Sequence, residues 1–327
     1  MTGLCLPSTA VRDRALAAAR RLDQQDEPDE PDEPDAESIE FLSSAVIYDG
    51  ARSRPAELAG VRFWVPDFLA ADPAAGRAAA AAMPRLEVIQ AQSAGVDVLL
   101  PIVPSGVTLC DARGVHGSST SEWALTALLS VLREFPRFER ARQQRHWDHS
   151  VTDELAGKQV LIIGAGDVGQ QLARRITACD AQPTFVARTA REGVHAIDEL
   201  PQLLPGADAV VLIVPKTTET LGMVDADFLA RMPDGAVLVN AARGPVVDTD
   251  ALLAELTSGR LRAALDVVDP EPLPADHPLW TAPNLLLTPH VAGSVLGLGN
   301  RFAALLVEQL RLFVHGRPLR NVVTGQY

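Results

Sequence analysis

Short apolar runs alternate with helical patterns along most of the chain. In the second half the alternation is regular, with β-branched apolar runs separated by segments whose apolar residues recur every three or four positions. Such a pattern predicts parallel strands that helices cover on both faces of a sheet. The predicted strands are Gln159–Ile163, Thr184–Val186, Ala209–Val214, Ala236–Asn240, Arg262–Asp266 and Leu285–Leu287, and the predicted helices are Val168–Ala178, Ile197–Leu204, Asp225–Arg231, Thr249–Ser258 and Asn300–Val314.

The first half follows a less regular version of the same pattern. A long helix is expected to start at Ser119–Glu122, which has the spacing of a capping box, to be interrupted at Pro136 and to resume as far as Arg145. Before it, the predicted strands are Leu4–Pro7, Ile39–Ser43, Val61–Val65, Leu86–Gln90 and Val107–Cys110, with a helix at Ala74–Met83 and a turn and helix at Gly95–Leu100. We therefore expect an α/β fold.

An acidic segment at residues 24–38 contains the tripeptide DEP three times in succession. Like charges repel one another and proline at every third position prevents a helix, so we expect a mobile surface loop. Its function is either that of a solvated insertion or that of an acidic docking segment. The chain as a whole has a net charge of −13 and only 5% aromatic residues, which argues against nucleic acid and anionic membranes as partners.

The remaining composition is that of an ordinary globular protein. The 327 residues suffice for two domains, and 47% hydrophobic residues permit a sizeable core. Cys5, Cys110 and Cys179 fit neither a disulfide framework nor a metal-ligand spacing, so we expect reduced thiols and no metal. Since no signal peptide and no apolar stretch of about 20 residues is found, we expect a cytoplasmic protein.

The segment 164–169, of sequence GAGDVG, has the pattern G-x-G-x-x-G of dinucleotide-binding folds. It follows a predicted strand and opens a predicted helix, which is the context that the pattern requires. Its first glycine would make a tight turn, its second would let the backbone approach a pyrophosphate, and its third would let helix and strand pack closely. N–H groups at the helix start would bind the anion. The predicted dinucleotide-binding residues are Gly164, Gly166, Asp167, Val168 and Gly169, and a purely structural turn is the alternative.

The end of the next predicted strand departs from the pattern typical of NAD. An acid that holds the ribose hydroxyls is expected about 20 residues after the glycines, but the chain has Arg188, Thr189 and Arg191 there, and no carboxylate before Glu192. An arginine suits the 2′-phosphate of NADP through charge-assisted hydrogen bonds. We therefore expect NAD(P)H as the cofactor, with NADP(H) preferred over NAD(H) and with Arg188 and Thr189 beside it. Alternatively, the arginines are ordinary surface charges.

Three polar residues, Arg243, Glu271 and His290, follow predicted strands of the second half. The carboxyl ends of parallel strands meet at one edge of a sheet, so the three can converge on a bound cofactor. Histidine exchanges protons near neutral pH, a carboxylate would orient its ring, and arginine would bind a substrate carboxylate and polarise a carbonyl. Each residue alone could be structural. Together they favour hydride transfer at the reacting carbon of a 2-hydroxy acid, with a nicotinamide as the hydride carrier.

Longer strings extend these motifs and carry a family resemblance. The strings are LAGKQVLIIGAGDVG at 155–169, VPKTTET at 214–220, NAARGPVVD at 240–248, ALDVVDPEPLP at 264–274 and TPHVAGS at 288–294. They resemble the D-isomer-specific 2-hydroxyacid dehydrogenase family, in particular its glyoxylate and hydroxypyruvate reductases. The segment Gln92–Asp97 resembles the loop with which that family grips the substrate carboxylate, although an ordinary glycine-containing turn would look similar.

The resemblance implies roles for individual residues. It assigns catalysis to Arg243, Glu271 and His290, and substrate binding to Ala94, Gly95, Arg243 and Ser294. Around the cofactor it adds Val214, Pro215, Thr220, Ala241, Ala242, Arg243, Asp266, His290 and Gly293 to the residues named above. The nicotinamide carboxamide is expected near Asp266, which could otherwise be a capping acid at a strand end.

The resemblance also implies how the chain is divided. We expect two doubly wound parallel-sheet domains: a smaller flavodoxin-like substrate domain at residues 1–116, which includes the acidic loop 24–38, and a Rossmann dinucleotide-binding domain at 117–292. A C-terminal segment, 293–327, would return to the substrate domain. A homodimer is expected. Trp147 falls where some hydroxypyruvate-reducing members place a tryptophan that reaches the partner subunit's site, with ordinary packing as the alternative.

The expected function is that of an NAD(P)-dependent oxidoreductase acting on the CH–OH group of a D-2-hydroxy acid or on the matching 2-oxo acid, glyoxylate or hydroxypyruvate. A dehydrogenase of another 2-hydroxy acid or of phosphite is one alternative. A second alternative is a dinucleotide-sensing scaffold, like the transcriptional corepressors that resemble this family and keep the same three residues. The expected partner is a small molecule, with neither nucleic acid nor membrane involved.

Overall fold

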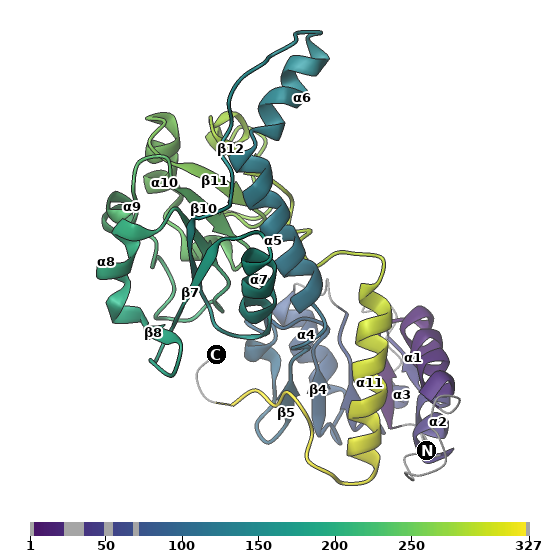
Figure 1. The fold of residues 1–327 in the computed structure, drawn as a ribbon. Coiled ribbons are helices and arrows are strands. Elements are labelled where there is room, and N and C mark those ends of the chain that lie inside the picture. The colour runs from purple at the N-terminus through teal and green to yellow at the C-terminus, as the bar shows by residue number, and fades with distance from the viewer. Residues whose placement is uncertain (1–2, 23–35, 49–54, 68–71, 325–327) are drawn as a thin grey trace. The chain divides into compact units, whose positions relative to one another are not determined.

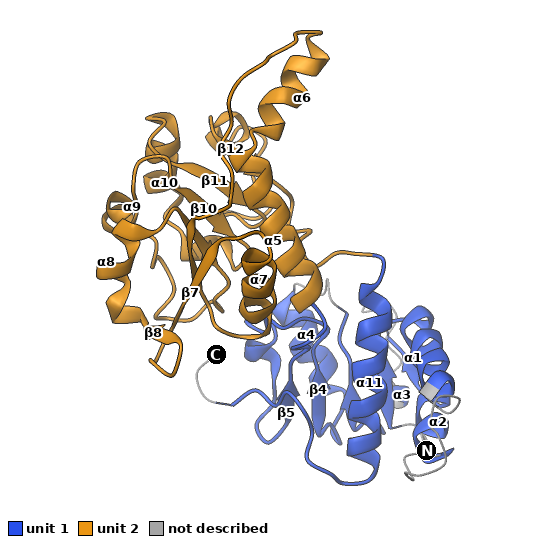
Figure 2. Cartoon of the chain, in the orientation of Figure 1, with its two compact units in different colours: residues 1–116, 296–327 blue, residues 117–295 orange. Residues whose placement is uncertain are grey.

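The structure is a computed structural model and describes residues 3–22, 36–48, 55–67 and 72–324. The chain forms two compact units, of which one comprises Met1–His116 and Leu296–Tyr327 and the other Gly117–Val295 (Figures 1 and 2). Each contains a parallel sheet with helices, which confirms the predicted α/β class with two parallel-sheet domains. The predicted acidic loop lies outside the described residues, except that positions 36–38 belong to a helix.

The Gly117–Val295 unit is built on seven parallel strands in the order β12-β11-β10-β9-β6-β7-β8. The strands are β6 (Gln159–Ile163), β7 (Gln182–Ala187), β8 (Val194–Ala196), β9 (Ala209–Leu212), β10 (Val237–Asn240), β11 (Arg262–Leu265) and β12 (Leu285–Leu287). The strand order reverses between β6 and β9. Doubly wound sheets bind ligands at such a reversal, outside the carboxyl ends of the strands.

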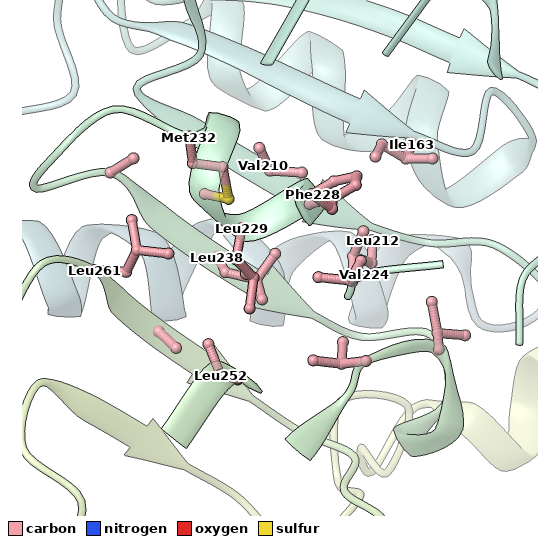
Figure 3. Packing of buried hydrophobic residues seen from close by; sticks show 14 of the residues in the cluster. Ile163, Val210, Leu212, Val224, Phe228, Leu229, Met232, Leu238, Leu252 and Leu261 are labelled. Carbon is pink, nitrogen blue, oxygen red and sulfur yellow. The ribbon is translucent and has the colours of Figure 1, made fainter. Parts of the chain in front are cut away.

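Alternate side chains of these strands enter two separate cores. On β6, Leu161 and Ile163 pack against α8 (Leu200–Leu203), α9 (Ala226–Arg231) and α10 (Thr249–Thr257), as Figure 3 shows for part of this core. Val160 and Ile162 pack on the other face against α5 (Gly117–Leu132) and α7 (Asp167–Thr177). Because both faces of the central strands β6, β9 and β10 are buried, these strands are mainly apolar runs that the sequence reveals clearly.

The other unit is built on five parallel strands in the order β2-β1-β3-β4-β5, which is the flavodoxin-like order. The strands are β1 (Leu4–Leu6), β2 (Val46–Ile47), β3 (Phe63–Trp64), β4 (Val88–Gln90) and β5 (Thr108–Cys110), and the helices are α1 (Thr9–Leu22), α2 (Ala36–Ser43), α3 (Pro55–Leu58), α4 (Pro73–Ala81) and α11 (Leu298–Val314). The last helix, α11, packs beside α1 (Figure 1). The C-terminal segment is thereby part of the unit that contains the N-terminus.

A buried amide pair ties α11 to this sheet. Gln309 Nε2 donates to Gln90 Oε1 at 2.7 Å and to the carbonyl oxygen of Arg320 at 2.9 Å. Gln90 Nε2 in turn donates to the carbonyl oxygen of Asp111 at 2.9 Å. Both amides are fully buried, and their hydrogen bonds offset the cost of removing them from water.

The two thiols of this unit, Cys5 and Cys110, are buried. Burial raises the pKa of Cys5 to about 12 and the pKa of Cys110 to about 11, so both stay protonated at neutral pH. In the described parts of the chain, each helix is too short or too polar to cross a bilayer.

Some predicted elements of the first unit are wrong. Ile39–Ser43 lies in the helix α2, not in a strand, because Ile39 and Leu42 are one helical turn apart and pack together into the core. The strand beside β1 is instead β2, a two-residue element too short to be predicted. The segment predicted as a turn and helix at Gly95–Leu100 holds turns, followed by a 3₁₀ turn at Leu100–Ile102.

The predicted capping box is also wrong. Helix α5 starts at Gly117, two residues before the predicted cap, and the Ser121 hydroxyl donates to a backbone carbonyl within the helix. The interruption is correct, because α5 ends at Leu132 and α6 runs over Phe135–Gln143 with Pro136 in its first turn. The edge strand β8 was not predicted.

Candidate active site

The glycine turn joins β6 to α7 at the point where the strand order reverses. Gly164 has a φ of 122°, and its N–H donates to the Val186 carbonyl at 2.8 Å. A Cβ at Gly164 would lie 2.5 Å from the carbonyl oxygen of Ile213, and a Cβ at Gly169 would overlap the carbonyl oxygen of Gly164. The fold itself therefore requires glycine at both positions.

Gly166 lies in a different environment. It is the residue before the first turn of α7, and a Cβ there would meet no atom within 4 Å. The N–H groups of a first helical turn have no partner within the helix and attract an anion. The side chain of Asp167 accepts a hydrogen bond from Gln171 at 3.0 Å and lies against Gly117. The start of α7 thus offers backbone N–H donors beside open space at Gly166.

The loop between β7 and β8 brings an arginine to this turn. Arg191 Nη2 donates to the Ala165 carbonyl at 3.2 Å, while Arg191 and Val194 exchange two backbone hydrogen bonds of 3.0 and 2.9 Å. Arg188 and Thr189, the residues predicted at the cofactor, are exposed in the same loop directly after β7. The structure therefore places the Arg191 guanidinium at the glycine turn. Arg188 lies three residues earlier in the same short loop.

The loop after β9 is closed by Thr220. Its buried hydroxyl donates to the Pro215 carbonyl at 2.7 Å and accepts from the Thr217 N–H at 2.9 Å. The predicted cofactor residues Val214 and Pro215 lie within this loop. Their neighbour Ile213 contacts Gly164, so the loop starts beside the glycine turn.

The loop after β10 carries Arg243. Its backbone is extended, and its Nη1 donates to the Ala242 carbonyl at 2.8 Å. The next residue, Gly244, lies so close to the Val268 carbonyl that a Cβ there would overlap it. The turn containing Arg243 therefore packs against the segment that leads to Glu271.

His290 and Glu271 form a direct pair. The His290 Nδ1 and Glu271 Oε1 atoms are 2.6 Å apart, and the two side chains are 45% and 41% exposed. With its Nδ1 proton donated to the carboxylate, the ring keeps Nε2 for proton exchange with another molecule. His290 has a φ of 53°, and its N–H donates to the Asp266 carbonyl at 2.7 Å.

Asp266 shapes the loop that holds His290. Its carboxylate is 3% exposed and accepts hydrogen bonds from the Thr288 hydroxyl at 2.6 Å and from the N–H groups of Val291 and Ala292, both at 2.8 Å. Gly293 and Ser294 follow in the same loop. Asp266 therefore acts as a capping acid, and what it caps is the loop after β12.

The predicted substrate loop lies in the other unit. Ala94 and Gly95 follow β4 and are half-buried. The Ser93 hydroxyl donates to the Gly95 carbonyl at 2.6 Å, and the Ser93 carbonyl accepts from the Ala112 N–H at 2.9 Å. Within this unit the loop thus has a defined backbone conformation.

Sequence reasoning did not identify Asn240 as part of the site. Its side chain is buried and contacts the backbone of the Arg243 loop. An amide at the carboxyl end of a buried strand, three residues before a candidate arginine, would have been a usable indication. Among the described residues, no group of three or more His, Cys, Asp and Glu side chains is placed to hold a metal ion.

The chain is similar in sequence to proteins of one family. The family model described as "D-isomer specific 2-hydroxyacid dehydrogenase, NAD binding domain" matches residues 125–292, just over half of the chain. A D-3-phosphoglycerate dehydrogenase from Archaeoglobus fulgidus is 32% identical over 249 residues, which are 73% of this chain and 47% of that protein. The chain spans about half the length of the first curated relatives that it matches.

Solved structures match the whole chain. A D-isomer specific 2-hydroxyacid dehydrogenase from Xanthobacter autotrophicus Py2, in complex with NADPH and MES, has a TM-score of 0.78 and 29% identity, and the match covers 99% of this chain and 98% of that one. An NADPH-dependent glyoxylate/hydroxypyruvate reductase from Sinorhizobium meliloti, in complex with NADP and sulfate, has a TM-score of 0.77 and 26% identity, with 98% and 97% covered.

Two glycine variants test which glycine of the turn the fold requires. Gly164→Ala places a Cβ against the Ile213 carbonyl at a φ that alanine rarely adopts, and we expect it to lower the free energy of unfolding by about 1–3 kcal/mol. Gly166→Ala meets no atom and should leave stability unchanged. Urea unfolding of both variants measures this; equal stability of the two would contradict the geometry described here.

Proposed function

Because the chain belongs to the D-isomer specific 2-hydroxyacid dehydrogenase family, we propose that it is an NAD(P)-dependent oxidoreductase that reduces a small 2-oxo acid to the D-2-hydroxy acid. The observation that carries the proposal is the His290–Glu271 pair at the carboxyl edge of the sheet that bears the glycine turn. Glyoxylate and hydroxypyruvate are the proposed substrates, supported by the similarity to the Sinorhizobium meliloti reductase.

The proposed roles follow from the chemistry of the side chains. His290 gives a proton to the developing alkoxide from Nε2 and takes it back in the reverse direction, while Glu271 keeps the ring oriented through Nδ1. Arg243 binds the substrate carboxylate and stabilises charge on the carbonyl oxygen. The backbone of Ala94 and Gly95 binds the carboxylate, and Ser294 also belongs to the proposed substrate site.

The proposed cofactor site follows the glycine turn and the adjoining loops. A bound nicotinamide supplies the hydride. The backbone N–H groups from Gly166 to Gly169 would hold the pyrophosphate, as the open space beside Gly166 allows. The remaining proposed contacts come from the loops that carry Val214, Pro215, Thr220, Ala241, Ala242, Asp266 and Gly293.

Removal of His290 should slow turnover far more than it weakens cofactor binding. In assays of NADPH and NADH oxidation with glyoxylate, hydroxypyruvate, pyruvate and phenylpyruvate, we expect His290→Ala to lower kcat/KM by about 10²–10⁴-fold, because the proton donor is lost. NADPH affinity, measured by fluorescence, should change far less.

The matched control is His195→Ala. His195 is paired with Glu199 at 2.8 Å, in the same unit and at similar exposure, but it lies on β8. Wild-type activity of His290→Ala would refute the proposed role. NADPH binding without turnover of any oxo acid by the wild-type protein would favour the dinucleotide-sensing scaffold, and turnover of phosphite alone would favour a phosphite dehydrogenase.

We further propose that NADP(H) is preferred over NAD(H). The support is the loop between β7 and β8, in which Arg191 is anchored on the Ala165 carbonyl and Arg188 is exposed beside it. Two guanidinium groups near the end of β7 suit a 2′-phosphate. The similar proteins from Xanthobacter autotrophicus and Sinorhizobium meliloti have themselves been solved with NADPH and NADP respectively.

Arginine variants test this preference. Arg188→Ala and Arg191→Ala should each weaken NADPH binding by about 10–100-fold, since a charge-assisted hydrogen bond contributes about 1.5–3 kcal/mol, and should change NADH binding little. Arg174→Ala, on the exposed side of α7, controls for loss of positive charge alone. Dissociation constants for both nicotinamides measure the effect; an equal loss for NADPH and NADH would remove the proposed phosphate contact.

We propose a homodimer formed through the α6 region, because large apolar side chains are exposed there. Trp147 and Val151, in the segment after α6, are 91% and 94% exposed, and α6 projects from the body of its unit (Figure 2). Two large apolar side chains exposed within five residues of one another suit an interaction surface. We expect the wild-type protein to sediment as a dimer and Trp147→Asp as a monomer, with Leu221→Asp as an exposed apolar control. A monomeric wild-type protein would contradict the proposal.

A further inference from the structure

We infer that Asn240 is a positioning residue for Arg243, so that its side-chain amide sets how well the guanidinium engages the substrate. The inference rests on the proposed function for its catalytic consequence. Its structural part, that the Asn240 amide fixes the Arg243 loop, stands on contacts within the Gly117–Val295 unit alone.

Asn240 lies at the carboxyl end of β10, between two neighbouring strands of the sheet. It is the last residue of β10, is 1% exposed, and pairs in register with Leu212 of β9 and Leu265 of β11. Its backbone carbonyl still accepts from the Asp266 N–H at 3.0 Å. The backbone of Asn240 thus takes part in the sheet, and its side-chain amide is available to form hydrogen bonds with the loop that follows.

The side-chain amide binds two consecutive loop residues. Its Oδ1 accepts from the Ala242 N–H at 3.0 Å, and its Nδ2 donates to the Arg243 carbonyl at 3.1 Å. Both a donor and an acceptor are needed, which an amide supplies and a carboxylate or an aliphatic side chain of similar size does not. Asparagine at this position therefore has a specific physical reason.

These two hydrogen bonds restrain both the backbone of Arg243 and a partner of its guanidinium group. The Arg243 carbonyl is held by Nδ2, and the Arg243 Nη1 donates to the carbonyl of Ala242, the residue whose N–H is held by Oδ1. The backbone origin of the arginine side chain and one partner of its guanidinium are consequently fixed by one buried amide. A displacement of about 1 Å in such a group can cost about 10²-fold in rate.

A merely structural role for Asn240 predicts something different. A buried amide that serves stability alone would, when replaced, lower the free energy of unfolding without changing how the remaining folded protein uses Arg243. The two roles therefore differ in a double-mutant cycle, because residues that act through one another give non-additive effects.

The experiment compares Asn240→Leu and Asn240→Asp with wild type, alone and combined with Arg243→Ala. Asn240→Asp keeps the acceptor for Ala242 and serves if Asn240→Leu does not fold. We expect each single variant to lower kcat/KM for the oxo acid by about 10–100-fold, mainly through KM, with NADPH affinity changed less than about threefold. In the Arg243→Ala background the Asn240 substitutions should change kcat/KM less than about twofold.

The control is Asp225→Ala, which removes the cap of α9, a hydrogen bond from the Phe228 N–H to Asp225 Oδ1 at 2.8 Å, and should leave kcat/KM unchanged. Full additivity of the Asn240 and Arg243 substitutions would overturn the inference. So would a loss of NADPH affinity as large as the loss in kcat/KM.

Hydrogen–deuterium exchange of the protein without substrate separates this inference from the proposed function. Exchange in the peptide 241–247 should speed up about tenfold or more in Asn240→Leu and stay unchanged in Asp225→Ala, because Asn240 accepts the Ala242 N–H. Unchanged exchange would overturn the inference whatever the activity. Faster exchange in a protein whose wild type reduces no oxo acid would support the loop contact and refute only the catalytic role.

Discussion

The carboxyl edge of the seven-stranded sheet imposes the constraint on which the candidate site depends. Where a parallel strand ends inside the protein, the next backbone N–H and C=O groups lose their ladder partners but remain out of water, and each unpaired group is costly. Three neighbouring strand ends meet this constraint with a buried polar side chain: Thr220 after β9, Asn240 on β10 and Asp266 after β11. Each binds its own loop or another one, so each of these loops is held by hydrogen bonds from a buried side chain.

The functional side chains depend on these loops more than the loops depend on them. The His290–Glu271 pair is nearly half exposed, and an exposed ion pair contributes only about 0–1 kcal/mol. That is too little to hold two loops together. The three hydrogen bonds to Asp266, which is buried, fix the turn that carries His290, and the imidazole then meets Glu271 as a consequence. The candidate catalytic side chains are therefore positioned by buried polar residues whose hydrogen bonds hold the loops.

The sequence predicted the Gly117–Val295 unit well and the other unit less well. The central strands β6, β9 and β10 are buried apolar runs, and their predicted limits agree with the structure to within two residues, with no difference at either end of β6. The less buried β7 is longer than predicted, and β8 was missed. Ile39–Ser43 failed because four or five apolar and polar residues fit a strand or a helix equally, and only the contacts of Ile39 and Leu42 with the core decide. The family strings located the candidate site residues. They did not indicate that Asn240 acts on a loop, since that depends on which backbone groups the fold leaves unpaired.

A polar side chain of a family motif can form hydrogen bonds with its own loop, with a ligand or with both. The number of hydrogen bonds that it can still form after those to the loop decides whether it can also bind a ligand. The Thr220 hydroxyl has one hydrogen, which goes to the Pro215 carbonyl, and Thr217 occupies its acceptor side with its N–H at 2.9 Å and its hydroxyl at 3.2 Å. A carboxylate offers about four acceptor positions, of which Asp266 uses three for Thr288, Val291 and Ala292. Asp266 can therefore close its loop and still accept one donor, such as the proposed carboxamide. The Thr220 hydroxyl is thus used within its own loop, and its proposed part in the cofactor site is to hold the backbone of Val214 and Pro215 in place.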